Sequence, residues 1–237
     1  MLLALDIGNT FIKYGIYERN NLLRFTRVKH NRFNSINFNE FKISEVAVSS
    51  VVPKVEEEIS KSVLERFNIS PYHIDKNNTL GITLNYSSVT TLGIDRICAA
   101  VGAFYSSDNS SNIIYADLGT ATTINYVIDG AFEGGLILPG LETMINSLNL
   151  NTAQLPKVDL SQYNNFIGKD TPDCIISGII NSTICVIEKS VSQLNTRTKL
   201  IITGGNAKFI EPHLDLEYEF IEDLVLRGVK KIFELNN

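Results

Sequence analysis

Two stretches of the sequence decide the fold: LLALDIGNT at residues 2–10 and IIYADLGTA at residues 113–121. Each stretch is an apolar run that leads through an aspartate into a turn containing a glycine, and a second strand-like run follows at 11–17 and at 122–128. Two such runs joined by a short glycine turn are typical of a β-hairpin. Because the same hairpin pattern occurs twice, the sequence predicts an internal duplication.

The segments around the two hairpins predict further strands and helices. In the first half of the chain we expect strands at 22–28, 45–52 and 72–74 and helices at 54–67 and 93–105. In the second half we expect strands at 131–138 and 199–203 and helices at 141–150, 173–194 and 228–235. The 173–194 helix has Pro172 at its first position and Asp170 or Thr171 as its cap.

The order of these elements indicates the α/β fold class. We summarise each half as βββαβα, an order that packs as two related lobes with a cleft between them. The polar run at 109–112 is the best candidate for the boundary between the lobes. The first lobe then comprises residues 1–110 and the second residues 111–237.

The composition describes an acidic chain with enough apolar residues for a sizeable core. The 237 residues are 44% hydrophobic and 20% charged, and the formal net charge is -5. This charge argues against a nucleic-acid or anionic-membrane partner, whereas backbone dipoles can still bind a small anionic ligand. We expect no membrane-spanning run, and residues 2–5 reach Asp6 without a preceding basic region, which argues against a signal peptide. We therefore expect a cytoplasmic protein.

The cysteines and histidines form no recognisable metal-binding or catalytic pattern. Cys98, Cys174 and Cys185 lie in apolar runs without CxxC spacing, so we expect buried free thiols rather than a disulfide framework or a zinc site. The three histidines are far apart in the sequence, which disfavours a histidine metal cluster or a catalytic triad.

The two glycine turns have a chemical use beyond closing a hairpin. Such a turn can present backbone N–H groups to a phosphate, and glycine allows the phosphate to approach without a Cβ clash. The preceding aspartate can hold the metal ion that accompanies a nucleotide, and threonine hydroxyls at Thr10, Thr120 and Thr122 add donors. One such turn is usually only structural. Two copies in two lobes could bind the β- and γ-phosphates of a nucleotide from both sides.

A glycine pair at Thr203-Gly204-Gly205-Asn206 allows two interpretations. It could let a flat ligand such as adenine or ribose approach the backbone, or it could be a plain strand-to-helix turn. The chain has no G-x-x-x-x-G-K-[ST] loop, no G-x-G-x-x-G fingerprint and no protein-kinase motif set. A nucleotide would therefore bind through the paired hairpins.

Taken in order, these motifs resemble those of type III pantothenate kinases, in the acetate and sugar kinase/Hsc70/actin superfamily. The resemblance covers nearly the whole chain. It is carried by DIGNT (6–10), GIDR (93–96), DLGTATT (117–123) and TGG (203–205), with support from SSVVP (49–53), GGLILPG (134–140), Gly168-x-x-Thr171 and Ser177-Gly178.

The resemblance implies a fold, an activity and cofactors. The fold would be two ribonuclease H-like (actin-like ATPase) lobes. The activity would be ATP-dependent phosphorylation of pantothenate to 4′-phosphopantothenate, the first step of coenzyme A biosynthesis. It implies ATP with Mg²⁺, a monovalent cation (K⁺ or NH₄⁺) and a homodimer with the substrate pocket near the interface, where Thr171 could act in its own or in the partner subunit.

The resemblance also implies a role for each matching residue. Asp95 would be the general base, Asp6 would lie near the magnesium ion and contact it through water, and Asp117 would bind the monovalent cation. Pantothenate would be bound by Tyr86, Gly93, Ile94, Asp95, Arg96 and Thr171. ATP would be contacted by Asp6, Ile7, Gly8, Asn9, Thr10, Phe11, Ile12, Lys13 and Thr120.

Structural readings of the same residues remain open. Asp95 could be only a helix N-cap or half of an ion pair with Arg96, and Lys13 and Tyr86 could be ordinary strand-surface residues. The anion that Arg96 would bind is either a substrate group or the transferring phosphoryl. The chain could also be a kinase for another small hydroxyl substrate, or a nucleotide-binding regulator that has lost catalysis.

Three segments depart from the pattern of the family. Ser88-Val89 stand where Asn-Pro is usual, Asp170 replaces an asparagine before Thr171, and Asn206 follows the glycines in place of leucine or histidine. These departures leave the proposed base and both phosphate turns intact. They affect the substrate loop.

Two predicted helices carry more apolar residues than lobes of this size are expected to cover. The 93–105 and 173–190 segments are apolar on most sides. Small residues at Gly102, Ala103 and Gly178 would permit close helix approach. We therefore expect a subunit interface along these helices.

Overall fold

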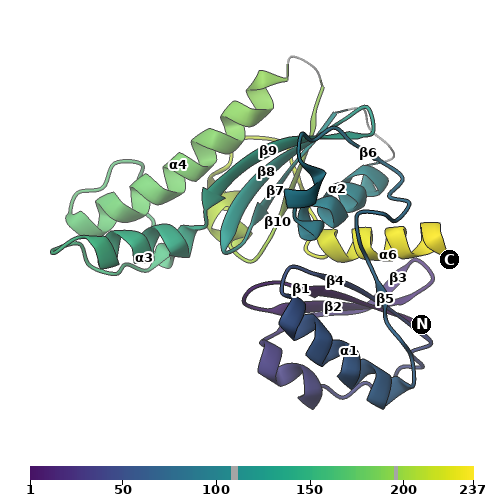
Figure 1. Ribbon diagram of the computed structural model, residues 1–237. Coiled ribbons are helices and arrows are strands. Elements are labelled where there is room, and N and C mark those ends of the chain that lie inside the picture. The colour runs from purple at the N-terminus through teal and green to yellow at the C-terminus, as the bar shows by residue number, and fades with distance from the viewer. Residues whose placement is uncertain (108–111, 195–196) are drawn as a thin grey trace. The chain divides into compact units, whose positions relative to one another are not determined.

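The computed structural model describes residues 1–107, 112–194 and 197–237, and the chain is a mixed α/β protein (Figure 1). It divides into two compact units. Unit 1 comprises Met1–Ser110, Asp129–Glu133 and Asp223–Asn237, and unit 2 comprises Ser111–Ile128 and Gly134–Glu222. The boundary expected at 109–112 lies, except for Asn112, outside the described residues.

The sheet of unit 1 has five strands in the order β3-β2-β1-β4-β5. The central strand β1 is antiparallel to β2 and parallel to β4, and all six of its residues are buried, as expected of a strand covered on both faces. The strands are β1 (Leu2–Ile7), β2 (Ile12–Glu18), β3 (Asn21–Val28), β4 (Glu45–Ser50) and β5 (Tyr72–His73).

Helices pack with this sheet in unit 1. They are the short 3-10 helices η1 (His30–Ser35) and η2 (Val89–Thr91) and the α-helices α1 (Pro53–Phe67), α2 (Ile94–Ser106) and α6 (Leu224–Asn236). Phe33 of η1 and Ile59 and Val63 of α1 join residues of β1, β2 and β4 in one hydrophobic cluster. The short strand β6 (Thr83–Leu84) pairs with the first residues of β9 (Ala131–Pro139).

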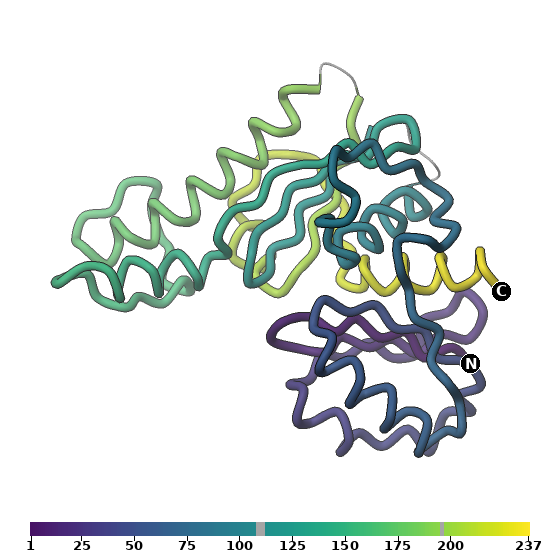
Figure 2. Tube along the Cα trace, in the orientation of Figure 1, coloured from purple at the N-terminus to yellow at the C-terminus, as the bar shows by residue number. Residues whose placement is uncertain are grey.

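The C-terminal helix α6 belongs to unit 1, so the expectation that the second lobe runs to residue 237 is wrong. Figure 2 shows α6 running beside α2. The two backbones approach so closely that a Cβ at Gly228 would overlap the carbonyl oxygen of Cys98, and a Cβ at Gly102 would overlap that of Leu224. The small residues of α2 therefore serve packing within the chain, and Gly102 and Ala103 do not form the expected subunit interface.

The sheet of unit 2 repeats the strand order of unit 1. The strands are β7 (Asn112–Leu118), β8 (Ala121–Ile128), β9, β10 (Lys199–Thr203) and β11 (Glu219–Phe220). The full strand order of this sheet is β11-β10-β7-β8-β9-β6. Without β6 and in the reverse direction it is β9-β8-β7-β10-β11. If these five strands are numbered along the chain, this order is 3-2-1-4-5, the same as in unit 1. The summary βββαβα is therefore one strand short for each half: the five strands of the first sheet were all expected individually, whereas β11 was not. The duplication extends from the hairpins to the five-strand order of the sheets.

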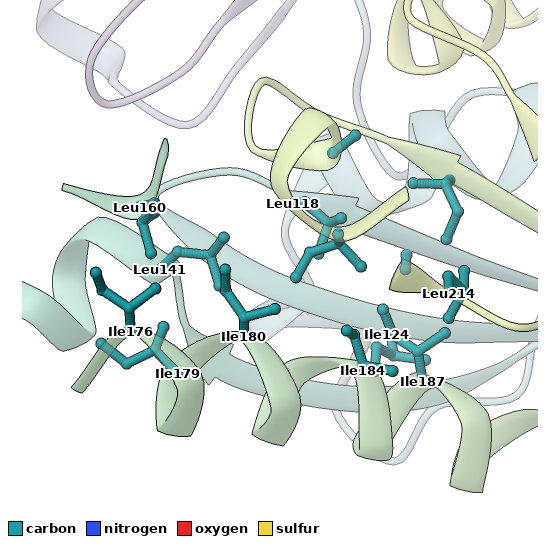
Figure 3. Close-up of a cluster of buried hydrophobic side chains, with 14 of the residues drawn as sticks. Leu118, Ile124, Leu141, Leu160, Ile176, Ile179, Ile180, Ile184, Ile187 and Leu214 are labelled. Atoms are coloured by element: carbon teal, nitrogen blue, oxygen red, sulfur yellow. The ribbon is translucent and has the colours of Figure 1, made fainter. Parts of the chain in front are cut away.

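Two successive helices follow β9 in unit 2, namely α3 (Leu141–Asn151) and α4 (Thr171–Gln193), and the shorter η3 (Leu160–Gln162), α5 (Ala207–Ile210) and η4 (Glu211–His213) complete it. The N-cap of α4 is Asp170, whose carboxylate accepts a hydrogen bond from Asp173 N at 2.9 Å. Isoleucines on one face of α4 point toward Leu118 and Ile124 of the sheet (Figure 3).

The long helix α4 corrects two expectations from the sequence. By length and composition it could cross a membrane, although half of its most apolar window is buried inside the protein. Its apolar content comes from isoleucines at helical spacing, which form the core of unit 2. Cys174 and Cys185 lie on its exposed face, so only Cys98 is the buried thiol that we expected.

Candidate active site

The first of the two turns that we expect to bind phosphate connects β1 and β2 through residues 8–11, and its tip is exposed. Gly8 N donates a hydrogen bond to Phe11 O at 3.0 Å, and Asn9 and Thr10 are exposed. The side chains of Ile7 and Ile12 are fully buried in the core of unit 1. Ile7 and Ile12 could therefore contact a ligand only through their backbone atoms.

The second turn, between β7 and β8, also begins with a glycine whose amide closes the hairpin, but it is one residue shorter than the first turn. Gly119 N donates to Ala121 O at 3.0 Å, and Thr120 and Ala121 are exposed. The carbonyl oxygen of Thr120 accepts hydrogen bonds from Gly140 N at 3.0 Å and from Thr143 Oγ1 at 2.8 Å. The amides of both turn glycines thus close the hairpins, and the outward donors that we expected have to come from the residues that follow them.

Neither turn glycine is required by the fold itself. Their φ angles lie outside the left-handed region, and a Cβ would first meet Phe11 O at 3.4 Å from Gly8 and Ala121 O at 3.5 Å from Gly119. These are ordinary van der Waals distances. The absence of side chains at Gly8 and Gly119 is therefore explained better by the approach of a ligand than by packing.

Asp6 is held from the neighbouring strand and helix of unit 1. It is 6% exposed, and Ser49, its register partner on β4, donates to Asp6 Oδ1 at 3.3 Å. Burial raises the pKa of the Cys98 thiol on α2 well above its ordinary value, the carboxylates of Asp6 and Asp95 raise it further, and a hydrogen bond with Ser49 opposes them. Asp6 and Asp95 therefore both lie within electrostatic reach of one buried thiol.

Asp95 lies in the first turn of α2 and is not its N-cap. The N-cap is Gly93, and Asp95 Oδ1 accepts a hydrogen bond from Arg96 N at 2.8 Å. A Cβ on Gly93 would overlap this carboxylate, which explains the glycine at that position. The carboxylate of Asp95 thus accepts a hydrogen bond from one amide of the first turn, and its negative charge interacts favourably with the positive end of the helix dipole. The side chain is half-buried.

Arg96 is 8% exposed and its guanidinium lies against two aromatic rings of unit 1. Its central carbon is 5.3 Å from the ring of Phe132 and 5.9 Å from that of Tyr86. Tyr86 is therefore not an ordinary strand-surface residue. No sequence signal identifies Phe132, because this residue belongs to none of the motifs and lies in β9, far along the chain from the GIDR motif.

Asp117 is the penultimate residue of β7 and lies directly against the glycine loop that follows β10. Gly204 has a φ of +98°, and a Cβ there would lie 2.6 Å from Asp117 Oδ1 and from the backbone of Leu118. Asn206 binds the same turn, because its N–H donates to Leu118 O at 2.9 Å and its side-chain Nδ2 donates to Gly119 O at 3.2 Å. The second phosphate turn and the glycine loop thus form one assembly in unit 2.

The described residues contain no group of three or more histidine, cysteine or acidic side chains that could hold a metal ion by themselves. Asp6 and Asp117 are single carboxylates, one in each unit. A single carboxylate such as that of Asp6 fits Mg²⁺, which usually keeps several waters and uses one or two carboxylates together with substrate phosphates.

Thr171 belongs to a different part of unit 2. It lies at the N-terminal turn of α4 and lines a pocket of about 560 Å³ together with Leu148, Leu155, Cys174 and Gly178. Helix α3 links this pocket to the second phosphate turn, since Thr143 contacts Thr120 and Leu148 follows little more than one helical turn later. Tyr86, Gly93–Arg96 and the first turn thus belong to unit 1, whereas Thr120, Asp117 and Thr171 belong to unit 2, where Thr171 lies apart from Asp117 in the pocket on α4.

Comparison with known proteins identifies relatives along the whole chain. A family model described as type III pantothenate kinase matches residues 2–193. A type III pantothenate kinase of Sulfurihydrogenibium sp. is 34% identical over 97% of this chain and 98% of its own length. One of Desulfosudis oleivorans is 35% identical over 92% of this chain and 96% of its own length.

Solved structures agree on the fold. A conserved protein of Campylobacter jejuni, assigned to the Baf family of transcriptional activators, has a TM-score of 0.68 at 23% identity and covers 98% of this chain and 97% of its own. The ADPNP-bound activator of the 2-hydroxyisocaproyl-CoA dehydratase from Clostridium difficile has a TM-score of 0.53 at 12% identity, over 99% of this chain and 95% of its own. Identities this low show the actin-like ATPase fold alone and carry over no function from either protein. The family match and the relatives above 30% identity show that this chain belongs to the type III pantothenate kinase family.

Proposed function

We propose that this chain transfers the γ-phosphoryl group of ATP to the terminal primary hydroxyl of pantothenate, giving ADP and 4′-phosphopantothenate, the first step of coenzyme A biosynthesis. Membership of the family supports the reaction. The structural observation that supports it is the placement of both carboxylates in unit 1. Ser49 of β4 donates to Asp6 Oδ1 at 3.3 Å, and α2, the helix that carries Asp95, packs against β4.

Phosphoryl transfer depends on positioning and on charge stabilisation more than on covalent chemistry by the protein. The exposed backbone of residues 9–10 and 120–121 supplies donors to the phosphates. Mg²⁺, when bound near Asp6 through water, supplies neutralisation of the phosphate charge. Asp95 accepts the hydroxyl proton while the bond from that oxygen to the γ-phosphorus forms and the bond to the β,γ-bridging oxygen breaks.

Arg96 provides a fixed positive charge for this reaction. The rings of Tyr86 and Phe132 restrict its guanidinium by cation–π contact, so little side-chain entropy is lost when an anion binds. Its anionic partner is the pantothenate carboxylate or the transferring phosphoryl group.

Asp117 binds a monovalent cation, K⁺ or NH₄⁺, in this proposal. Its carboxylate is half-buried and is fixed against Gly204, where no side chain separates it from the glycine loop. A cation there would offset the charge repulsion between the ATP phosphates.

The chain acts as a homodimer in the cytoplasm, with α4 at the interface. The exposed face of α4 carries small residues, and a Cβ on Gly178 would meet nothing within 4 Å. Glycine within a helix costs about 1 kcal/mol relative to alanine, and the open space beside Gly178 leaves room for a second copy of the chain. Exposed apolar side chains of unit 2 at Leu150, Phe166 and Ile167 add further surface that a second copy could cover.

An assay of ADP release over pantothenate, sugars and acetate tests the proposed reaction. ADP release that depends on pantothenate supports it. ADP release with another acceptor identifies a different kinase of the superfamily. Binding of ATP without acceptor-dependent release identifies a nucleotide-binding regulator.

A further inference from the structure

The glycine carbonyl of each phosphate turn accepts a hydrogen bond from a side chain outside its hairpin. In unit 1, His30 Nε2 lies 2.9 Å from Gly8 O. In unit 2, Asn206 Nδ2 lies 3.2 Å from Gly119 O. Gly8 and Gly119 hold the same place in the duplicated motif, two residues after Asp6 and Asp117. The two donors come from unrelated elements, η1 in unit 1 and the loop after β10 in unit 2.

The direction of each hydrogen bond follows from the acceptor. A carbonyl oxygen can only accept, so Nε2 of His30 carries the hydrogen and donates it, as does the side-chain amide of Asn206. In the second turn the next carbonyl is fixed as well, because Thr120 O accepts from Gly140 N and Thr143 Oγ1.

Fixing a carbonyl also orients the amide hydrogen that follows it. The described part of the chain has no cis peptide bonds, and in a trans peptide the C=O of one residue and the N–H of the next point in opposite directions. His30 therefore turns the N–H of Asn9 away from itself, and Asn206 does the same for Thr120. Thr143 and Gly140 orient the N–H of Ala121 in the same manner.

These three amides belong to the exposed residues at the tips of the turns. Without the side-chain donors, the peptide after each glycine could rotate, since glycine tolerates most backbone angles. A rotated peptide would present a carbonyl oxygen instead of an N–H to an incoming phosphate. The two side-chain donors thus determine that the peptide after each turn glycine presents its N–H group, the positive end of the peptide dipole, to a phosphate.

We propose that His30 and Asn206 are positioning residues for the ATP phosphates: each holds the carbonyl of a turn glycine, and thereby directs the amide of Asn9 or of Thr120 toward the nucleotide. This inference rests on the proposed function. It assigns to this chain two residues that touch the turns and not the reacting atoms.

The test compares the affinities of the full-length protein for Mg-ADP and for adenosine, measured by calorimetry. His30→Phe and Asn206→Leu keep much of the side-chain volume but remove the donor. Each should weaken Mg-ADP binding about 3- to 10-fold, as expected for one lost hydrogen bond, and leave adenosine binding unchanged. The double variant should show roughly the product of the two effects, because the donors lie in different units.

Matched controls separate positioning from general destabilisation. His73→Phe and Asn236→Leu remove the same atom types from hydrogen bonds elsewhere and should leave Mg-ADP affinity unchanged. His30→Gln retains an amide donor and should recover most of the affinity that His30→Phe loses. If either same-size variant does not fold, His30→Gln against His30→Ala, and Asn206→Ser against Asn206→Ala, give the same comparison.

Unchanged Mg-ADP affinity in folded donor-less variants overturns the inference, as does an equal loss for Mg-ADP and adenosine, which would mean general support of the loops. Failure of the proposed function looks different. A wild-type protein that binds Mg-ADP but releases no ADP with pantothenate contradicts the proposed reaction, while the affinity comparison still decides the role of His30 and Asn206.

Discussion

The two units share a sheet and a turn but differ in what is attached to them. In both, the first strand leads through an aspartate into a glycine turn, and the strand order is the same. Between the third and fourth strands, unit 1 has only a short segment with η1, whereas unit 2 has the helices α3 and α4. The shared part fits a ligand feature that both units can bind, the phosphates. The parts that differ carry the proposed base on α2 and the pocket on α4.

A finer difference lies beside the two aspartates. Ser49 pairs in register with Asp6 and donates to its carboxylate, whereas Thr203, the register partner of Asp117, has its hydroxyl 3.5 Å from the carbonyl oxygen of Glu222. In unit 2 the position beside the carboxylate is taken by Gly204. The duplication thus kept an aspartate before each glycine turn, while the groups around the two carboxylates diverged.

The largest expected effect separates the chemistry of unit 1 from that of unit 2. Asp95→Asn should keep the fold and ATP binding but lower kcat roughly 10²- to 10⁴-fold, because an amide cannot accept the hydroxyl proton. Steady-state kinetics with pantothenate measures the change. Asp129→Asn, at an exposed hairpin turn, is the matched control and should leave kcat unchanged. A variant Asp95→Asn with more than about half of the wild-type kcat would reduce Asp95 to a first-turn helix residue.

The next effect tests whether Asp117 has a role that Asp6 lacks. Activity should require K⁺ or NH₄⁺ and fail in Na⁺ alone, since the site has to match the size and hydration of the ion. Asp117→Ala should remove this dependence together with most of the turnover. Rates measured at constant ionic strength in potassium, ammonium and sodium buffers provide the comparison, and equal rates in sodium and potassium would contradict the assignment.

The two turn glycines test whether the turns are equivalent. Gly8→Val and Gly119→Val should each raise the KM for ATP roughly 10- to 100-fold, as expected when a branched side chain blocks hydrogen bonds to a charged phosphate. Neither Cβ meets the protein closely, so the melting temperatures should change little. A large effect at one turn only would show that the units differ in nucleotide binding, and an unchanged KM in both folded variants would place the nucleotide elsewhere.

The smallest expected effect on catalysis concerns the exposed face of α4, a helix that has no counterpart between the third and fourth strands of unit 1. Wild-type protein should scatter light at micromolar concentration as roughly twice the chain mass of 26.4 kDa. Gly178→Leu should give the monomer mass, because the side chain would occupy the space reserved for the second copy. Gly178→Ala is the control, since it should stabilise the helix by about 1 kcal/mol. A fully active wild-type monomer would exclude both the interface and a pocket shared between subunits.

Local sequence patterns predicted the parts of the site that lie on short contiguous segments. Both hairpins, the turn glycines, the first turn of α2 and the loop after β10 were all located from residue order and spacing. Helical periodicity could also have identified the outer face of α4, because Cys174, Gly178 and Cys185 alternate with isoleucines that point to the core. Apolar content alone had suggested that these cysteines are buried.

The remaining features depend on long-range pairing, which one sequence does not reveal. Ser49 meets Asp6 only because β4 pairs in parallel with β1, and Phe132 meets Arg96 only because the first residues of β9 belong with α2 to unit 1. The placement of α6 in unit 1 rests on the contact of Gly228 with Cys98, far along the chain. His30 was noted only as an isolated histidine, since its partner is a backbone carbonyl that carries no sequence signal.

The most direct test of the account is the identification of the product formed from ATP and pantothenate, by phosphorus NMR and mass spectrometry, with wild-type protein and Asp95→Asn side by side. The wild-type protein in potassium buffer should form ADP and 4′-phosphopantothenate in equal amounts. Asp95→Asn should form almost none of either product at equal ATP occupancy. Absence of phosphorylated pantothenate with the wild type, or equal product formation by both proteins, would contradict the account.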